Sequence, residues 1–337
     1  MGRHHARVYA NDPGVELIGV VDNDGDRAQL IAEAHNTRAF RTEQELLDAG
    51  VEAVSVAVPT TAHEQAASLF LSAGVACLIE KPIAPNADAA RRLQRLAEAS
   101  NATLMVGHIE RFNPVMRAMR KATEHGERIM PRFIEVHRVS PMTFRSVDIG
   151  VVMDMMIHDL DVVLNLMGGR EPDEVEASGV AVVTEHEDIC NARLTFRTER
   201  GDCVANITAS RLALKTERVT RITGENGYIK IDYAAKRGII IRRTANELQM
   251  QEVREQLRQG IDLTDLAWAD LVNIEELEID DAEPIVMEIN AFLEAVRKGT
   301  KPEIDAEAGF VNVRTAERIV ESIARFMRAP MPAPPGR

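Results

Sequence analysis

The sequence predicts an α/β protein built from two parts, and three observations lead to this prediction. Residues 1–110 alternate short apolar runs with helix-length segments, which is typical of a parallel, doubly wound sheet with helices on both faces. From about residue 174 to residue 243, strand-like runs follow one another with few helices between them, which favours a large, mostly antiparallel sheet. The length of 337 residues suits two domains. We expect domains over residues 1–110 and 111–330.

The elements of the first domain can be placed by their apolar runs and flanking turn residues. The expected helices cover residues 4–11, 27–35, 63–73 and 87–100. The expected strands cover residues 15–21, 53–58, 75–79 and 103–107. Right-handed crossovers between parallel strands place all the strand ends on one edge of the sheet. Residues that follow a strand directly are therefore the first candidates for a site.

The second domain is expected to begin with a helix and to continue mainly as strands. Helices are predicted over residues 112–124, 151–167, 284–298 and 307–327. Strands are predicted over residues 131–139, 174–183, 189–198, 202–210, 217–223, 228–232 and 238–243. Residues 249–278 are acidic and poorly periodic, so we interpret them as a surface excursion or lid. Helices should cover one face of the sheet, and the other face is free to pair with another subunit.

Composition excludes several classes of function. The formal net charge of −13 disfavours general binding to nucleic acid or to an anionic membrane. No apolar run reaches the roughly 18 residues of a membrane span, and the N-terminus lacks the apolar segment of a secretory signal. The three cysteines are widely spaced, so they predict reduced thiols and no disulfide framework or zinc site. We expect a cytoplasmic protein that acts on a small molecule.

The stretch from Val75 to Pro85, V-A-C-L-I-E-K-P-I-A-P, is the strongest local signal. Five mostly apolar residues read as a buried strand, and Glu80, Lys81 and Pro82 follow at once. In an open parallel sheet, ligands bind outside the carboxyl ends of the strands, which is where Lys81 falls. Proline removes a backbone donor and holds the preceding residue extended. A polar turn without any site is the competing interpretation.

Asp22 ends the first predicted strand and is a candidate for binding a dinucleotide. An acidic side chain at the end of the second strand of such a fold bonds the adenosine ribose hydroxyls. Its charge repels the 2′-phosphate of NADP, so Asp22 favours NAD. The alternative is a solvent-exposed turn, because Asp22-Asn23-Asp24-Gly25 is turn chemistry in any fold.

The glycine fingerprint that normally precedes this acidic residue is nearly absent. The fingerprint G-x-G-x-x-G has a strand before it and a helix after it. Here Gly2 stands where the last glycine would be, at close to the expected spacing of about 20 residues from Asp22. The first strand and two glycines would lie upstream of Met1. We therefore expect this chain to bind NAD weakly or to have low stability.

A second group of candidate residues lies in the predicted helix 151–167. Asp154 and His158 are separated by four residues and share one helix face, and Asp161 lies three residues further on. A histidine beside a carboxylate is oriented and more basic, which suits a proton acceptor. A polar helix edge explains the same pattern without catalysis. A metal site would need a third convergent ligand beyond Asp161, and we expect none.

Two further histidines follow predicted strands. His63 comes shortly after Pro59 and Thr60, so it is placed to face a cofactor or to begin a helix. His108 follows the strand ending at Gly107 and is placed to approach the same edge. Both are weaker candidates than Lys81 or His158.

Taken together, these motifs resemble the Gfo/Idh/MocA oxidoreductases over nearly the whole chain. The resemblance is carried by G-R-H-H-A-R at the start, V-V-D at Asp22, V-P-T before His63, E-K-P at 80–82, D-M-M-I-H-D-L-D at 154–161, P-I-V-M-E-I-N-A-F and G-T-K-P. Two runs, V-G-H-I-E-R-F-N-P and the segment 144–161, are similar to bacterial UDP-N-acetylglucosamine 3-dehydrogenases. The resemblance implies oxidation of a sugar hydroxyl to a ketone, with UDP-N-acetylglucosamine oxidised at position 3.

The resemblance implies a Rossmann domain, here without its first strand, and a C-terminal domain that forms a homodimer or homotetramer through its open sheet. It implies NAD as the cofactor. The implied catalytic residues are Lys81, His158 and Asp154. The implied cofactor contacts are Gly2, Asp22, Pro59, Thr60, His63, Glu80 and Lys81. The implied substrate contacts are Lys81, His108, Arg145, Asp154, His158 and Arg211, the two arginines being candidates for the diphosphate. The alternatives are a dehydrogenase of inositol or a free sugar, and a non-catalytic relative with impaired cofactor binding.

Overall fold

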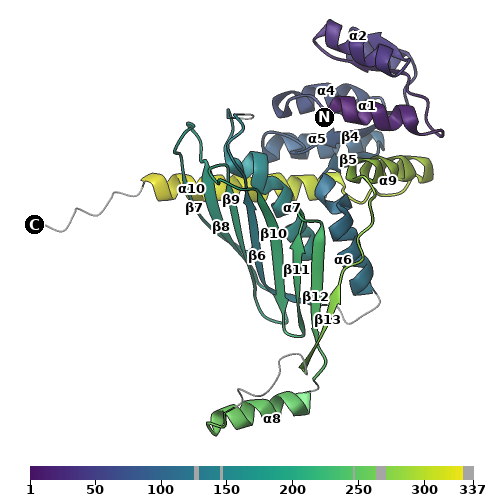
Figure 1. Ribbon diagram of the computed structural model, residues 1–337. Helices are drawn as coiled ribbons and strands as arrows, with labels where there is room; N and C mark the ends of the chain where they lie inside the picture. Colours follow the sequence, from purple (N-terminus) through teal and green to yellow (C-terminus); the bar gives the residue numbers. More distant parts are fainter. Residues whose placement is uncertain (125–128, 145–146, 246, 263–270, 329–337) are drawn as a thin grey trace, which may run out of the picture.

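The structure is a computed structural model that describes residues 1–124, 129–144, 147–245, 247–262 and 271–328. Helix-flanked parallel strands form the N-terminal half, and a large sheet backed by helices forms the rest of the molecule (Figure 1). This is the α/β architecture predicted from the sequence.

The N-terminal half holds two small parallel sheets. One pairs two strands, β1 (Gly19–Val21) and β2 (Arg38–Phe40). The other has the order β3 (Ala53–Val56), β4 (Ala76–Glu80), β5 (Leu104–Gly107). The helices are α1 (Gly2–Asn11), α2 (Gly25–Ala34), α3 (Glu43–Asp48), α4 (His63–Ser72) and α5 (Ala87–Ser100). In the described part of the chain, no strand pairs β1 to β3, so the sheet is in two pieces.

Strand β4 is the most deeply enclosed strand of this half. All five of its residues are buried, because β3 and β5 flank it and helices cover its faces. Helix α5 starts cleanly after β4 because the Asn86 side chain accepts a hydrogen bond from the Ala89 amide at 2.8 Å. The chain between them, which holds Lys81, is therefore fixed at both ends.

The C-terminal sheet has eight strands in the order β13-β12-β11-β10-β6-β9-β8-β7. Neighbours are antiparallel except for β6 and β9, which are parallel. The strands are β6 (Pro131–Val139), β7 (Glu174–Val180), β8 (Ile189–Phe196), β9 (Cys203–Ser210), β10 (Glu217–Gly224), β11 (Gly227–Asp232), β12 (Arg237–Arg243) and β13 (Val272–Glu276). The predicted mostly antiparallel sheet is confirmed.

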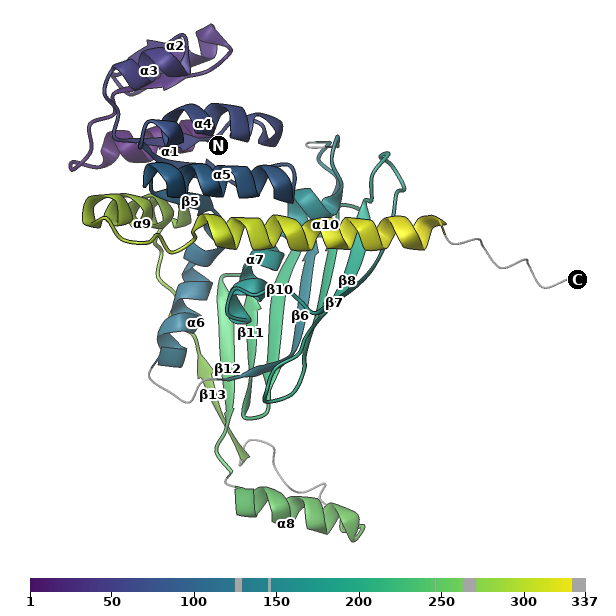
Figure 2. The ribbon, with the colours of Figure 1, turned by 180° about the vertical axis from the view of Figure 1, so that it is seen from behind.

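Helices cover one face of this sheet and leave the other open (Figures 1 and 2). The covering helices are α6 (Pro114–Glu124), α7 (Ile157–Leu166) and α10 (Ala306–Arg328). Alternation along β8 shows the two faces: Ala192 and Leu194 are buried, whereas Asn191 and Arg193 are exposed. A helix face and a strand face thus share one apolar core.

Helix α10 joins the two halves. It packs on α5 and β5 of the N-terminal half and on α7 and β7 of the large sheet, as Figure 2 shows. Helix α9 (Pro284–Lys298) packs against α1 and therefore also belongs with the N-terminal half, although it lies near the end of the sequence.

The segment 249–278 is predicted to be a surface excursion or lid, because it is poorly periodic. The structure has a helix, α8 (Glu247–Arg258), which projects beyond the edge of the sheet, and the edge strand β13 (Figure 1). An excursion is therefore confirmed for the described residues, but it is partly regular. Among the described residues, no helix combines the length and the apolar character that crossing a membrane requires.

Candidate active site

Lys81 lies directly after β4, at the carboxyl edge of the parallel sheet, as predicted. The Lys81–Pro82 peptide bond is cis. The His63 side chain is buried beside this turn, and its ring nitrogens lie 2.9 Å from the Pro82 carbonyl oxygen and 3.0 Å from that of Val58. His63 therefore links the turn after β3 to the turn after β4. Burial lowers the pKa of His63, and the surrounding backbone oxygen atoms oppose that shift. A neutral ring can donate to only one of the two carbonyl oxygens at a time.

The Lys81 ammonium group reaches the start of α7. Its Nζ donates a hydrogen bond to the main-chain oxygen of Asp154 at 3.0 Å. Burial lowers the pKa of Lys81, and the negative charges of Asp154 and Glu80 oppose that shift. The two candidate segments are thus in contact, and the contact uses the main chain of Asp154.

The helix expected over residues 151–167 is not regular. Residues Val152–Met156 form a π-helical turn, η3, and α7 follows from Ile157. Such turns are uncommon and occur frequently at functional sites. Asn312 of α10 is fully buried and donates from Nδ2 to the Ile157 carbonyl oxygen at 3.1 Å, which anchors the chain directly before His158. Sequence alone gave no signal for either feature.

His158 is partly buried at the start of α7, and in the described part of the chain its Nδ1 has no hydrogen-bond partner. Burial is the main cause that lowers the pKa of His158 well below 6.5, and the positive charges of Lys81 and Arg138 add to the effect. The imidazole is therefore neutral at pH 7 and can accept a proton. His108 behaves similarly: it is 1% exposed, its Nδ1 has no partner among the described residues, and burial lowers its pKa.

A layer of buried ion pairs supports these groups. The Arg138 guanidinium contacts Asp159 at 2.6 Å and Glu110 at 3.0 Å. The Arg111 guanidinium contacts both carboxylate oxygens of Asp161, at 2.7 and 2.6 Å. These carboxylates raise the pKa values of both arginines against the effect of burial, so the arginines stay cationic.

Apart from Asp161, the sequence reasoning missed these residues. Two aspartates in the apolar run I-H-D-L-D-V-V-L were a usable signal, because a buried carboxylate requires a partner. The sequence does not reveal which residues these partners are, since Arg138 is on β6 and Arg111 follows β5, both distant from the aspartates in the sequence. Asp161 is engaged by Arg111 in the structure.

Residues predicted to bind a dinucleotide lie at the ends of parallel strands. Asp22 follows β1 and accepts hydrogen bonds from the Asp24 amide at 3.0 Å and from Arg27 at 3.4 and 3.5 Å. Pro59 and Thr60 follow β3 and open the short helix η1 (Thr60–Ala62). Gly2 opens helix α1. A helix start and a carboxylate at strand ends are the groups that an NAD pyrophosphate and ribose require, so these residues fit that cofactor.

Glu80 turns away from solvent. Its Oε1 lies 2.8 Å from His5 Nε2, and its Oε2 accepts a hydrogen bond from the Lys81 amide at 3.3 Å. The hydrogen bond from His5 and the nearby charges lower the pKa of Glu80 even though burial opposes this. Glu80 is therefore an anion directly behind Lys81.

Of the two arginines predicted to bind a diphosphate, only Arg211 is among the described residues. Arg145 lies outside the described residues. Arg211 is buried, donates to the Ile149 carbonyl oxygen at 2.8 Å and lies 3.8 Å from Asp188. Because Arg211 already has an anionic partner, a structural role competes with substrate binding.

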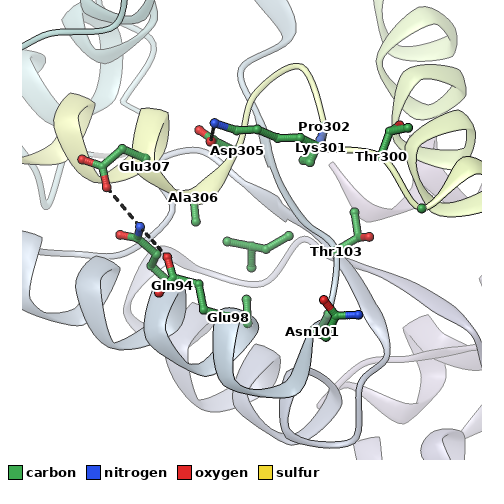
Figure 3. A pocket seen from close by; sticks show the side chains of 14 residues that line it. Gln94, Glu98, Asn101, Thr103, Thr300, Lys301, Pro302, Asp305, Ala306 and Glu307 are labelled. Atoms are coloured by element: carbon green, nitrogen blue, oxygen red, sulfur yellow. Dashed lines mark hydrogen bonds and ion pairs between the residues drawn. The ribbon is translucent and has the colours of Figure 1, made fainter.

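A separate pocket lies between α5 and the loop that precedes α10 (Figure 3). Its charged groups have partners: Lys301 pairs with Asp305, Gln94 donates to Glu98 and Glu307, and Arg91, outside the lining, also pairs with Glu307. None of the predicted site residues lines it. We assign it no role in the chemistry around Lys81.

The groups around Lys81 have the properties needed for oxidising an alcohol. A neutral imidazole can accept the hydroxyl proton, and a nearby ammonium can stabilise the negative charge that develops on the oxygen. A dinucleotide held by the residues at the neighbouring strand ends would complete such a centre. The ion-pair layer holds these groups in place.

Comparisons with known proteins agree with this chemistry. Residues 1–108 match a family model described as oxidoreductase family, NAD-binding Rossmann fold, and residues 117–230 match the GFO/IDH/MocA C-terminal domain. A UDP-N-acetylglucosamine 3-dehydrogenase from Acidithiobacillus ferrooxidans is 39% identical over 233 residues, which cover 69% of this chain and 71% of that protein. An inositol 2-dehydrogenase from Rhizobium meliloti is 30% identical over 192 residues, 54% of this chain and 56% of that protein.

A solved structure gives the same relationship over a greater length. The structure of UDP-N-acetylglucosamine 3-dehydrogenase from Acidithiobacillus ferrooxidans superposes with a TM-score of 0.83 and 33% identity, and covers 97% of this chain and 95% of that one. The similarity therefore includes both halves and their arrangement.

Proposed function

The chain belongs to the Gfo/Idh/MocA family of NAD-binding oxidoreductases, and on this premise we propose that it oxidises the 3-hydroxyl of UDP-N-acetylglucosamine. It is a dehydrogenase that acts on a sugar hydroxyl. The observation that carries the proposed catalytic site is the hydrogen bond from Lys81 Nζ to the main chain of Asp154, because it brings the two candidate segments together. The similarity to the Acidithiobacillus ferrooxidans enzyme supports the choice of substrate.

In the proposed mechanism, His158 accepts the proton of the sugar hydroxyl. Its depressed pKa keeps the imidazole neutral and able to do so. The Lys81 ammonium group stabilises the negative charge that develops on the oxygen of the sugar hydroxyl. NAD, when bound, accepts the hydride from the same carbon. Asp154 holds Lys81 in position through its main-chain oxygen. The predicted contact of His108 with the sugar belongs to the same proposal.

The preference for NAD over NADP is also a proposal. Asp22 is positioned after β1 to bond ribose hydroxyls and to repel a 2′-phosphate. Arg27 beside it partly offsets this charge, so the preference depends on both residues. The predicted contacts of Gly2, Pro59, Thr60, His63 and Glu80 with the cofactor belong to the same proposal.

The proposed oligomer forms through the open face of the large sheet. Register places a mostly apolar row across it, in which Thr223 is the polar member: Ile274, Ile241, Tyr228, Thr223, Phe133 and Val204. The next row carries both charges, because it includes Lys230, Arg221, Glu135 and Arg193. A second copy related by a two-fold axis presents the same two rows in the opposite direction. Apolar side chains of the two copies can then pack together, and residues of opposite charge can pair. We propose a homodimer or homotetramer, and a cytoplasmic location in keeping with the three buried free cysteines.

The direct test is formation of NADH, followed by absorbance, from NAD and UDP-N-acetylglucosamine. Myo-inositol serves as the competing substrate, because inositol dehydrogenases are also among the relatives. Turnover with the nucleotide sugar that is at least about 100-fold faster, in kcat/KM, supports the proposal, and this corresponds to about 2.7 kcal/mol.

The controls separate chemistry from binding. K81M should bind NAD, as followed by quenching of protein fluorescence, and should not form NADH. Faster oxidation of myo-inositol would replace the substrate proposal. Binding of NAD without oxidation of any sugar hydroxyl would favour the non-catalytic alternative.

A further inference from the structure

A buried cluster of polar side chains lies behind Glu80. It contains His5 of α1, Glu80 of β4 and Glu288 of α9, and one ligand-type atom from each lies within 4.8 Å of the others. Glu288 is fully buried, and neither of its carboxylate oxygens has a hydrogen-bond partner in the part of the chain described. Nothing in the proposed mechanism uses Glu288. A fully buried, unpartnered carboxyl group requires an explanation, because burial strongly disfavours its ionised form.

The hydrogen bonds around His5 run in one direction. Tyr9 Oη lies 2.7 Å from Ser55 Oγ, and Ser55 Oγ lies 3.0 Å from His5 Nδ1. His5 Nε2 lies 2.8 Å from Glu80 Oε1. An ionised Glu80 can only accept, so Nε2 carries the hydrogen and Nδ1 accepts from Ser55. Burial raises the pKa of Tyr9, so its hydroxyl remains the donor at the start of the chain.

The same reasoning locates a proton on Glu288. Two carboxyl groups this close in a buried site cannot both ionise. Glu80 has the His5 hydrogen bond, the Lys81 amide and the Lys81 charge, all of which favour its anion. Glu288 has no such donor. Burial is the largest cause that raises the pKa of Glu288, and the charges of Glu80 and Asp161 raise it further.

We propose that Glu288 is a positioning residue for Lys81. As a neutral carboxylic acid packed against the His5–Glu80 pair, it leaves Glu80 as the anion that accepts from the Lys81 amide and whose charge acts on the Lys81 ammonium group. An ionised Glu288 would compete with Glu80 for His5. The inference rests on the proposed function in one respect only, because it assigns Lys81 to the reaction.

The charged groups that face Glu288 come from every element around it. Glu80 comes from β4, His5 and Tyr9 from α1, and Asp161 from α7. Asp161 is neutralised by Arg111, so Glu80 is the charge that most needs its own partner. A divalent cation held by His5 and both carboxylates is the competing chemistry, and the test separates it from a proton.

The test compares E288Q, which is neutral and can donate a hydrogen bond, with E288L, which cannot. E294Q, at an exposed site on the same helix, is the control. We expect E288L to lose at least about tenfold in kcat/KM, and E288Q to stay within about threefold of the parent chain. E288L should also shift the titration of Lys81, followed by NMR of the lysine ammonium group, whereas E294Q should not.

Two readouts need neither sugar nor turnover. The infrared spectrum at pH 7 should contain the carbonyl band of a protonated carboxylic acid, and E288Q should lack it. Because the folded-state pKa of Glu288 is raised, its contribution to stability is full below the unfolded pKa near 4.5 and is lost as the pH rises. E288Q should therefore gain in unfolding temperature over the parent chain as the pH rises.

Several outcomes would overturn the inference. Absence of the infrared band, or identical pH dependence of unfolding in E288Q and the parent chain, would mean that Glu288 is ionised. Loss of activity in E288Q equal to that in E288L would have the same meaning. Stoichiometric Mn²⁺ or Zn²⁺ binding that E288Q abolishes would assign a cation site. If the parent chain has no turnover while the band and the Lys81 shift are present, the proposed function fails and the inference stands.

Discussion

His158 is the residue whose environment decides the direction of the proton. The imidazole can accept the hydroxyl proton only at a pH above its own pKa, and that pKa lies well below 6.5. We expect H158N to lower kcat by about 10²- to 10⁴-fold with little change in NAD binding. In the parent chain, kcat/KM should fall with acid only at a pH well under 6.5. An acid limb near 6.5 or above would contradict the assigned role.

Asp22 decides the nucleotide at the same scale. D22S removes the charge that repels a 2′-phosphate and releases Arg27 to attract it. We expect the ratio of kcat/KM for NADP to that for NAD to rise by about tenfold or more, equivalent to about 1.4 kcal/mol. D24N is the matched control, because Asp24 lies in the same turn and also contacts Arg27. An equal change in both variants would refute a specific role for Asp22.

How far single residues could be predicted depends on whether their partners are close in the sequence. Lys81 and His158 could be proposed from the sequence because each belongs to a recognisable local pattern. Glu288 and Arg138 could not be proposed, since the residues that each contacts lie more than 20 positions away in the sequence. The contact of Lys81 with the main chain of Asp154 was also inaccessible, because it depends on the π-helical turn.

Among the elements, the ion-pair layer makes β6 and α7 dependent on each other. R138M leaves Asp159 and Glu110 buried without their cation. Breaking a buried pair on one side costs about 3–5 kcal/mol, so we expect a loss of that size in the free energy of unfolding from urea titration. R92M removes an exposed pair between α5 and α4, and should have a much smaller effect. Similar losses in both variants would contradict the importance of burial.

Prediction succeeded for elements with a strong period and failed for short or polar ones. Strand β6 and helices α5 and α9 match their predicted limits, because each has a clear apolar pattern between distinct end signals. The strand predicted over residues 15–21 begins only at Gly19. Strand β2 has three residues, all at least partly exposed, and helix α3 buries only Leu46. Neither element has an apolar pattern long enough to be predicted from the sequence.

For the whole molecule, the open sheet face predicts how copies associate. Ile241 lies in the mostly apolar row between Ile274 and Tyr228, and I241K places a charge there. We expect the mass from light scattering to fall to that of the monomer, while circular dichroism keeps the folded signal. V320K, at an exposed position of α10, should leave the mass unchanged. An oligomer that survives I241K would move the interface away from this face.

The domain boundary at residue 110 remains a prediction. Helices α9 and α10 cross it, because they return from the end of the sequence to pack on the N-terminal half.

Helix α10 has 23 residues, which corresponds to a rod about 35 Å long. Since it is clamped at one end by α5 and β5 and at the other by β7, a wide hinge motion would have to bend or detach it. Motion between the two halves must then be small or confined to the loops that join their elements. A displacement of the large sheet would be passed along α10 to the N-terminal half.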